Sequence, residues 1–537
     1  MSDVLAGIGL VAAAGASGAA ILLPPGRLRA VLMVGAMALF PILIAGDQWH
    51  AAQIVDLRHD TARIVELLAL AAAAIGVLTY LFRRWPILLP LAILFAIPFR
   101  VPLHAGGESA NLLVPLYLVI AAGVVAAAIR DWGARPAGPV AAGDPPSPAT
   151  AQGMVLPTTP PTGGAAWLPR VLAAVVVLYA VQALYSADFS KGLQNVCFFL
   201  VPFTVAFALL RDVRWDAQLL RWVLIVVAVE AAAFVFIGSV EYVAKSLFWN
   251  DQIIRSNEFH TYFRVNSVFW DPNVYGRYLA LVTVVATAAL LWARTRQAFW
   301  LLSGLILVLW LGLVPTFSQS SLLALLAGLA VLAAIKWSWR WTLGVVAVGA
   351  IGAVLVVLLV GGSGKVTSDR LNVDLSGRGS LISGGADLFS ERPIQGYGSG
   401  SFQAAYRDHR KNKDAPVTIS HTEPVTVAAE QGLLGFALYI ALIVVALGTL
   451  GRGLWSARAA GPAAAGDPPP PATAQGVVPP TTSPTALAAR AAVLAAFVAL
   501  LVHTLAYAGF FEDPLTWVLL AVGASLAWAD PAVREPA

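Results

Sequence analysis

Charged residues are scarce in this chain. Of its 537 residues only 12% are charged, against about 25% in an ordinary soluble domain. The hydrophobic share is 59%, and a water-soluble fold of this length has too little interior to bury so many apolar side chains. We therefore expect lipid to cover them, in an all-α polytopic membrane protein.

Cysteine and metal-ligand patterns are also nearly absent. The single cysteine, Cys197, lies in an apolar run and excludes both a disulfide framework and a cysteine-based metal site. No second histidine stands at metal-binding spacing near His421, so we predict no protein-bound metal and no cofactor. The net charge is +5, but the basic residues form short clusters at helix ends, which argues against a nucleic-acid partner.

Long apolar runs are what the sequence has in abundance. A membrane helix needs about 20 apolar residues, and we expect about 12 to 15 such helices. The candidate spans are 4–23, 30–46, 63–82, 86–99, 111–129, 168–186, 193–210, 217–240, 276–293, 298–315, 320–336, 341–360, 432–450, 488–508 and 514–530. The weakest is 86–99, which is short and contains Pro86, Pro90 and Pro98.

Basic residues mark one side of the membrane. Loops between successive spans lie alternately on the two sides, and the basic pairs all fall in loops of one side. These pairs are Arg27/Arg29, Arg83/Arg84, Arg130/Arg135, Arg211/Arg214, Arg294/Arg296, Lys336/Arg340 and Arg452/Arg458. The positive-inside bias makes this side the cytoplasm. With every span counted, the N-terminus lies outside and the C-terminus inside. The first apolar run lacks a basic n-region, so we do not interpret it as a cleavable signal peptide.

Two cytoplasmic loops share a sequence and divide the chain. Residues 132–162 begin WGARPAGPVAAGDPPSPATAQG and residues 455–485 begin WSARAAGPAAAGDPPPPATAQG. Their Pro, Ala, Gly and Thr content predicts extended linkers, which we interpret as passive tethers. The predicted parts are membrane helices in 1–131, a linker 132–167, helices in 168–360 with an outside loop 241–275, a large outside loop 361–431 with short helices, a helix in 432–454, a linker 455–487 and helices in 488–537.

The first outside loop leads into a helix through WDPN. Arg264 offers a planar fork of donors suited to phosphate oxygens, although a salt bridge to Glu258 or Asp271 is the plainer alternative. Asp271 and the proline after it predict a turn and a capped helix start. Glu230 and His503 are ionisable residues within predicted membrane spans, and by default we treat such residues as candidates for a functional role.

The large outside loop carries the remaining candidate groups. We predict a short helix near 378–390, a glycine turn at 396–400 and a basic stretch at 407–413. The turn, GYGSG, is a weak match to phosphate loops, and its glycines more simply permit a tight backbone. His421 in SHTEP precedes a helix and suits proton transfer or phosphate binding, whereas a lone histidine is usually structural.

Three segments in order resemble the O-antigen ligase and O-antigen polymerase family. They are RVNSVFWDPNVYGRYLAL, then PTFSQSSLLALLAGL, and then SGRGSLISGGADLFSERPIQGYGSGSF followed by SHTEPVTVAAEQGLLGF. The resemblance spans roughly 170–530. It implies a metal-independent, inverting membrane glycosyltransferase of polysaccharide and lipopolysaccharide biosynthesis that needs no nucleotide sugar. The implied partners are a glycan on undecaprenyl pyrophosphate and an acceptor glycolipid or glycan, at the outer face of the bacterial inner membrane.

The resemblance also implies residue roles. Arg264 matches the family arginine before the PN helix and would hold the pyrophosphate, and His421 would be the base or orienting donor for the acceptor hydroxyl. A second family arginine corresponds to Arg378, and Arg277, Asn273 and Glu423 are further expected substrate contacts. This chain departs from the family at Gln319, where Arg is frequent, and at Thr422, where Asn is common.

Two other functions stay open on the sequence. A transporter or lipid-carrier flippase should concentrate polar residues and helix breaks near the bilayer midplane, often in paired halves. Here the polar residues gather in two outside loops and no paired repeat is visible, which favours the enzyme. The altered SQSS segment leaves a scaffold without activity as a third hypothesis.

Overall fold

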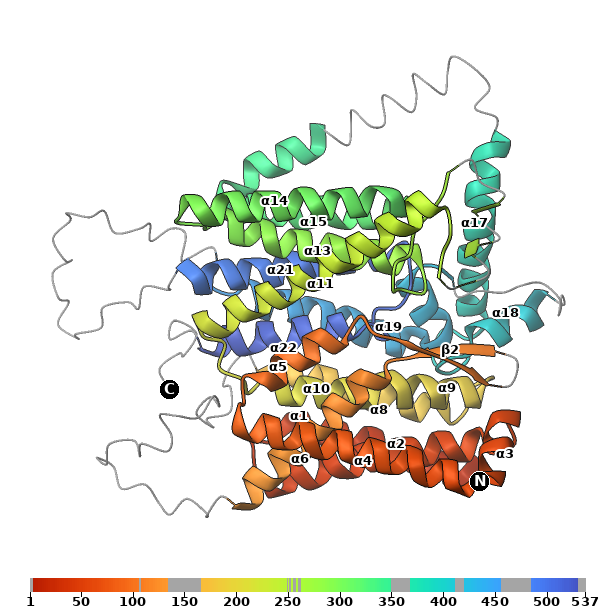
Figure 1. Cartoon of the computed structure of the whole chain (residues 1–537). Coiled ribbons are helices and arrows are strands. Elements are labelled where there is room, and N and C mark those ends of the chain that lie inside the picture. Colours follow the sequence, from red (N-terminus) through yellow and green to blue (C-terminus); the bar gives the residue numbers. More distant parts are fainter. Residues whose placement is uncertain are drawn as a thin grey trace, which may run out of the picture.

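The protein is a bundle of long helices with short helices at one end (Figure 1). This computed structural model describes residues 3–105, 108–133, 166–248, 250, 253–254, 257–258, 262–348, 368–410, 420–454 and 484–529. Most of the two predicted linkers, 134–165 and 455–483, lies outside the described residues.

The elements follow the chain in this order. The first third contains α1 (Asp3–Leu22), α2 (Arg27–Asp47), α3 (Ala52–His59), α4 (Thr61–Arg84), α5 (Leu88–Ala96), β1 (Val101–Ala105), β2 (Glu108–Leu112) and α6 (Val114–Gly133). The centre contains α8 (Trp167–Ala183), α9 (Phe189–Asn195), the π-turn η2 (Val196–Leu200), α10 (Val201–Leu210), α11 (Ala217–Ala244), α13 (Pro272–Leu291), α14 (Arg296–Leu313), η3 (Val314–Thr316) and α15 (Gln319–Lys336). The last part contains α17 (Ser368–Glu391), α18 (Phe402–Arg410), α19 (Glu423–Gly451), α21 (Pro484–Thr504) and α22 (Pro514–Ala529).

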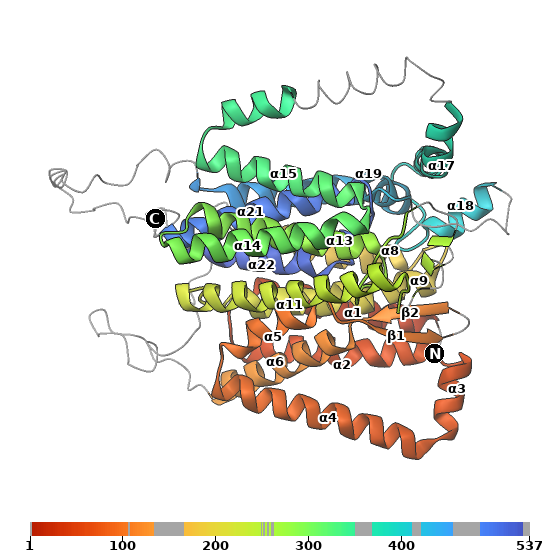
Figure 2. The ribbon, with the colours of Figure 1, turned by 45° about the horizontal axis from the view of Figure 1, so that its top comes forward.

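The predicted all-α polytopic membrane fold is confirmed. Among the described residues, 11 helices are long and apolar enough to cross a membrane, and Trp167–Ala183 and Pro514–Trp528 are shorter apolar helices. α4 stands at the outside of the bundle (Figure 2), with only 6% of its apolar window buried. In the predicted span 341–360 the helix that starts at 339 is described to 348, and the rest lies outside the described residues.

The weak predicted span at 86–99 contains only a short helix, which cannot cross the membrane by itself. α5 has nine residues, or about 14 Å of helix, which is half of the roughly 30 Å hydrocarbon core. The chain turns at Ile97 and Pro98 and then enters a two-strand antiparallel hairpin, β1 with β2, where Val101 pairs with Leu112. Non-helical backbone at membrane depth needs protein around it, and Ile97 and Pro98 are buried accordingly.

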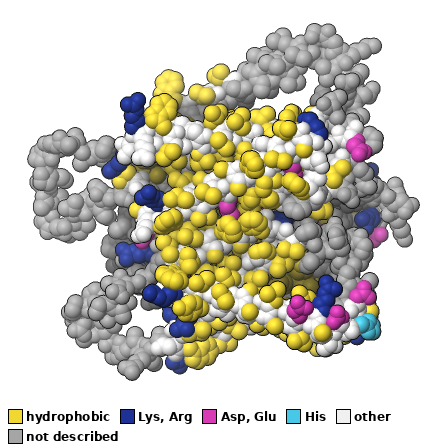
Figure 3. Space-filling model, viewed as in Figure 1, with side chains coloured by type: hydrophobic (Ala, Val, Ile, Leu, Met, Phe, Trp, Pro, Cys, Tyr) yellow, Lys and Arg dark blue, Asp and Glu magenta, His cyan; other side chains and the backbone are white. Residues whose placement is uncertain are grey.

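The two ends of the bundle differ. One end, which we name the linker end, holds the chain at Gly133, Trp167, Leu454 and Pro484; the opposite, loop end holds α3, the hairpin, α17 and α18 (Figure 1). An apolar belt crosses the visible face between them, with basic side chains along its left border (Figure 3). The N-terminal helix starts at the loop end and α22 finishes at the linker end (Figure 1).

The predicted loop 361–431 is largely helical where it is described. The expected helix near 378–390 is present within the longer α17, and α18 covers part of the basic stretch. α19 contains a break at Gly432, with φ 62° and ψ −163°. That break separates a short helix over 423–431 from the apolar run predicted at 432–450.

Candidate functional site

The start of α13 is built as the sequence predicts. Asp271 has extended backbone and its Oδ1 accepts a hydrogen bond of 2.6 Å from the Asn273 N–H, while Pro272 occupies the first turn. Aspartate satisfies one of the free amides of a first turn, and proline has no amide to satisfy there. The WDPN segment is therefore a fixed helix start at the loop end.

Arg264 is tied between two helix starts. Its Nε donates to the Thr316 carbonyl at 2.9 Å and its Nη2 donates to Asn273 Oδ1 at 3.2 Å. Its backbone N–H donates to Asn257 Oδ1 at 3.0 Å, and its carbonyl accepts from the Asn257 amide. The Thr316 carbonyl and Asn273 Oδ1 are neutral acceptors, and together they fix the orientation of the guanidinium.

Small hydroxyl side chains join α15 to α13. Ser318 caps α15, and its Oγ lies 2.8 Å from Ser321 Oγ and 3.1 Å from Ser320 Oγ. Ser321 Oγ donates to the Asn273 carbonyl at 3.4 Å. A Cβ added at Gly276 would meet that same Oγ at 2.7 Å, so only glycine permits this approach of the two helices. The serines thus fix the position of Asn273 beside Arg264.

His503 belongs to this serine cluster. Its Nε2 lies 3.2 Å from Ser320 Oγ, and the whole side chain is buried. The sequence marked His503 as a polar exception within a span. The structure places it at the end of α21, where it links that helix to the start of α15.

Arg277 lies one turn further along α13 and forms a buried ion pair. Its Nη2 is 2.7 Å from Asp513 Oδ2, and both side chains are 4% exposed. The Nε and Nη1 atoms of Arg277 are buried without a hydrogen-bond partner in the described part of the chain. Buried guanidinium donors are normally satisfied, so these two atoms leave capacity for an anionic oxygen.

The loop between α21 and α22 supplies a tyrosine near Arg277 in addition to Asp513. The Tyr507 ring centroid lies 5.9 Å from the Arg277 Cζ. Burial raises the pKa of the Tyr507 hydroxyl, and the nearby Asp271 raises it further. Tyr507 therefore stays a neutral hydrogen-bond donor beside the buried cation across the physiological pH range.

Three buried glutamates hold the loops of this end by the same device. Each carboxylate accepts two backbone N–H groups of a loop distant in sequence, and their side chains are at most 7% exposed. The pairs are Glu241 with Asn266 (3.2 Å) and Ser267 (2.7 Å), Glu423 with Gly509 (2.7 Å) and Phe510 (3.1 Å), and Glu430 with Gly400 (2.9 Å) and Phe402 (3.0 Å). Hydrogen bonds from backbone N–H groups to a carboxylate are stronger than those between neutral groups, so these contacts fix the loops.

The glycine turn at 396–400 is structural in this arrangement. Gly396, Gly398 and Gly400 have φ of 66°, 95° and 77°, the left-handed region that favours glycine. A Cβ at Gly396 would lie 2.3 Å from the Glu430 carbonyl. Two of the turn's amides are bonded to the Glu430 carbonyl and carboxylate, so the tight-turn interpretation agrees with the structure better than a phosphate loop.

His421 stands directly before α19 in an unusual conformation. Its φ is 61°, which is rare for a side chain with a Cβ, and it is half-buried. Ser420 Oγ on one side accepts from the Thr422 N–H at 3.2 Å and lies 2.7 Å from Thr426 Oγ. The chain therefore holds His421 at a sharp corner, where backbone strain is frequent in functional sites.

The structure brings most of the predicted site residues to the loop end. Arg264 and Asn273 touch, and Arg277 follows on the same helix. Glu423 and Arg277 are joined through the loop 509–513, to which each is bonded, and His421 lies two residues before Glu423. Arg378 lies on α17, but its side chain is outside the described residues.

Sequence reasoning missed Asp513. It caps α22 through Oδ1, which accepts from the Leu515 N–H at 2.8 Å, and it binds Arg277 through Oδ2. The signal was available, because Asp513 and the proline after it repeat the Asp-Pro pattern of Asp271. Among the described residues, no three His, Cys, Asp or Glu side chains form a group that would hold a metal ion.

Residues 304–440 match the family described as O-antigen ligase. A search of curated proteins finds no match. The matched segment contains the Thr316 carbonyl that binds Arg264, the serine cluster and His421, so it covers much of the site described above. Over residues 304–440 this match supports the resemblance to the O-antigen ligase and O-antigen polymerase family that the sequence predicted.

Proposed function

We propose that this chain is a membrane-embedded glycosyltransferase of the O-antigen ligase or polymerase type that acts on lipid-linked glycans, a function that the family match over residues 304–440 supports. We propose that this chain transfers a glycan from undecaprenyl pyrophosphate to a hydroxyl of an acceptor, either a lipid A-core-like glycolipid or another lipid-linked repeat unit. The reaction takes place at the loop end, which faces the outside of the bacterial inner membrane.

One observation carries the proposal. Arg264 is oriented by a carbonyl inside the O-antigen ligase segment, and His421 stands at a strained corner of the same segment. The fold thus fixes a permanent cation and a proton-transfer group at one end of the bundle. A substrate anchored in the bilayer by a lipid would present its pyrophosphate at this level.

The arginines fit the donor half of the reaction. The acceptor oxygen forms a bond to the anomeric carbon while that carbon loses its bond to the pyrophosphate oxygen, and the carrier leaves as a lipid pyrophosphate. Charge develops on the leaving oxygen, and guanidinium groups stabilise it. Arg264 performs this role, with Arg277 and Arg378 as further cations and Asn273 as a neighbour that orients Arg264.

His421 fits the acceptor half. It takes the proton of the acceptor hydroxyl as general base, or orients that hydroxyl as a hydrogen-bond donor. A single displacement of this kind inverts the anomeric centre without a covalent intermediate, and no step in it requires a metal. Glu423 positions His421 through its bonds to the loop 509–510.

Transfer by the purified full-length protein tests the proposal. The donor is a glycan on undecaprenyl pyrophosphate, and the acceptors are a lipid A-core glycolipid and a second lipid-linked repeat unit. We expect Arg264→Ala and His421→Ala to abolish transfer while the variants insert normally. Arg58→Ala and His59→Ala are matched controls, because both side chains lie on α3 at the same end of the bundle.

Each outcome decides between hypotheses. Full activity in both site variants would refute the assignment of Arg264 and His421. Uptake of a solute into proteoliposomes without glycan transfer would favour a transporter instead. Loss of activity on chelation, restored by a divalent cation, would contradict the metal-independent mechanism.

A further inference from the structure

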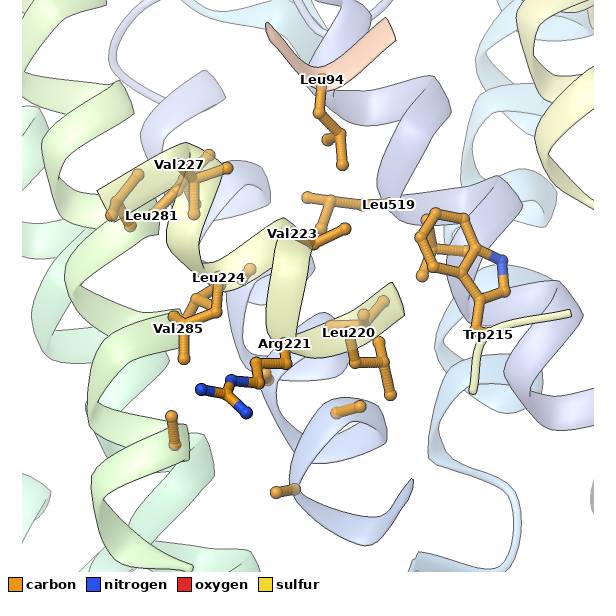
Figure 4. A pocket seen from close by; sticks show the side chains of 18 of the residues that line it. Leu94, Trp215, Leu220, Arg221, Val223, Leu224, Val227, Leu281, Val285 and Leu519 are labelled. Atoms are coloured by element: carbon orange, nitrogen blue, oxygen red, sulfur yellow. The ribbon is translucent and has the colours of Figure 1, made fainter. Parts of the chain in front are cut away.

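A cavity of about 480 Å³ runs along the helices from the linker end to Tyr278 and Leu515, next to the Arg277–Asp513 pair of the site just described. It is enclosed by α11, α13, α21 and α22, with the end of α5 above them (Figure 4). Its walls are apolar, with Val223, Leu224 and Val227 on α11, Val285 on α13 and Leu519 on α22. The volume is within the range of about 300–1,000 Å³ that small-molecule sites have.

The cavity follows the helix axes. Its lining positions on α13 run from Tyr278 to Trp292, a rise of about 21 Å at 1.5 Å per residue. One leaflet of the hydrocarbon core is about 15 Å thick. A hydrocarbon chain that enters at the linker end therefore fits along the cavity from the membrane surface to beyond the midplane.

The mouth at the linker end has a different composition from the walls. Arg221 at the start of α11 and Arg294 after α13 both line the cavity and are exposed. Neither forms a salt bridge among the described residues. Trp215 and Trp292 also line the cavity, and tryptophan is enriched at the level of the lipid headgroups. Figure 4 shows the Arg221 guanidinium directed between the helices.

From its mouth inward, the cavity is complementary to a phospholipid: cations for the phosphate, then aromatic rings, then apolar walls for the acyl chain. Two cations without carboxylate partners stand at the surface, aromatic rings with N–H groups follow, and an apolar channel continues inward. A neutral hydrocarbon would leave the two arginines unused. A lipid with its phosphate at the loop end, where Arg264 lies, would place its headgroup at the wrong end of this cavity.

We propose that the cavity binds one anionic phospholipid from the leaflet at the linker end. The phosphate lies between Arg221 and Arg294, and an acyl chain fills the space between α11, α13 and α22. The lipid thereby connects α13, which carries Asn273 and Arg277 at its other end, to two neighbouring helices.

Native mass spectrometry of the full-length protein tests this proposal. The protein, stripped of lipid, is titrated separately with phosphatidylglycerol, phosphatidylcholine and undecaprenyl pyrophosphate. We expect one phosphatidylglycerol to be retained at least fivefold more strongly than phosphatidylcholine. Arg221→Gln with Arg294→Gln should remove this preference. Arg83→Gln with Arg84→Gln is the matched control, since these arginines are exposed at the same end but do not line the cavity.

A second variant tests the channel itself. Ala289→Phe adds a ring to the lining of α13, and we expect it to weaken retention of phosphatidylglycerol while both arginines remain. The proposal is overturned if phosphatidylcholine binds equally well, if the Arg83/Arg84 control loses as much as the Arg221/Arg294 variant, or if undecaprenyl pyrophosphate displaces phosphatidylglycerol in a manner that depends on Arg221 and Arg294.

Discussion

The ion pair between Arg277 and Asp513 allows a structural role of Arg277 to be separated from a role in binding substrate. Arg277→Met removes the cation but keeps an apolar stem of similar length. It leaves the Asp513 carboxylate, which is 4% exposed, without its partner at 2.7 Å. Because a buried charge without a partner loses its hydration and gains nothing in return, we expect a large loss of stability.

The magnitude follows from the geometry of the pair. Removing one partner of a buried ion pair costs about 3–5 kcal/mol. Asp513→Asn removes the other charge but retains the oxygen that caps α22, since asparagine is a good cap. The double variant removes both charges of this pair, so it should be more stable than the sum of the single losses predicts, by about 1–3 kcal/mol.

The assay is equilibrium unfolding of the four proteins in mixed micelles, together with the rate of glycan transfer. If Arg277 contacts the donor through its unsatisfied Nε and Nη1 atoms, the double variant regains stability but not activity. Arg130→Met is a control, because the Arg130 side chain is 51% exposed in its pair with the buried Asp131, and a half-exposed pair contributes less than one whose two charges are both buried. Additive losses in the double variant would refute the coupling that the structure indicates.

Further predictions concern the loop end. Glu430→Gln keeps one acceptor oxygen but removes the charge that holds two loop amides, and we expect a loss of about 1.5–3 kcal/mol in unfolding free energy. Gly396→Ala places a Cβ 2.3 Å from a carbonyl at positive φ, so its destabilisation should exceed about 1 kcal/mol in the same measurement. Arg264→Lys retains the charge but cannot make both hydrogen bonds, to the Thr316 carbonyl and to Asn273. We therefore expect the kcat of transfer to fall by a larger factor than the affinity for the donor. The bond from the Tyr397 hydroxyl lowers the pKa of Glu391, so its stabilising effect is present above the ordinary carboxyl pKa and is lost as the pH falls through the lowered value. The protection factors of the amides at the end of α17, corrected for the intrinsic pH dependence of exchange, should therefore fall on acidification, and Tyr397→Phe should weaken that dependence.

The sequence by itself determined the membrane class and much of the local structure. The lengths of the apolar runs and the scarcity of charge led to the all-α polytopic fold, because a bilayer permits few alternatives to helices. Local chemistry was equally readable: the Asp271 cap, the glycines of the turn at 396–400 and the helix after His421 are each recognisable from a few adjacent residues, although Glu430 holds the turn in place. The order of the motifs led to the family.

The tertiary structure alone decided which polar groups meet. Arg277 pairs with Asp513, Arg264 with the Thr316 carbonyl, and Glu423 with the 509–510 amides, and each pair joins residues that lie far apart in the chain. In a membrane protein the helix faces that meet lipid and those that meet protein are similarly apolar, so hydrophobic periodicity does not show which helices are neighbours. Such partners become visible only when the helices are packed, because a buried charge is satisfied across space and not along the sequence.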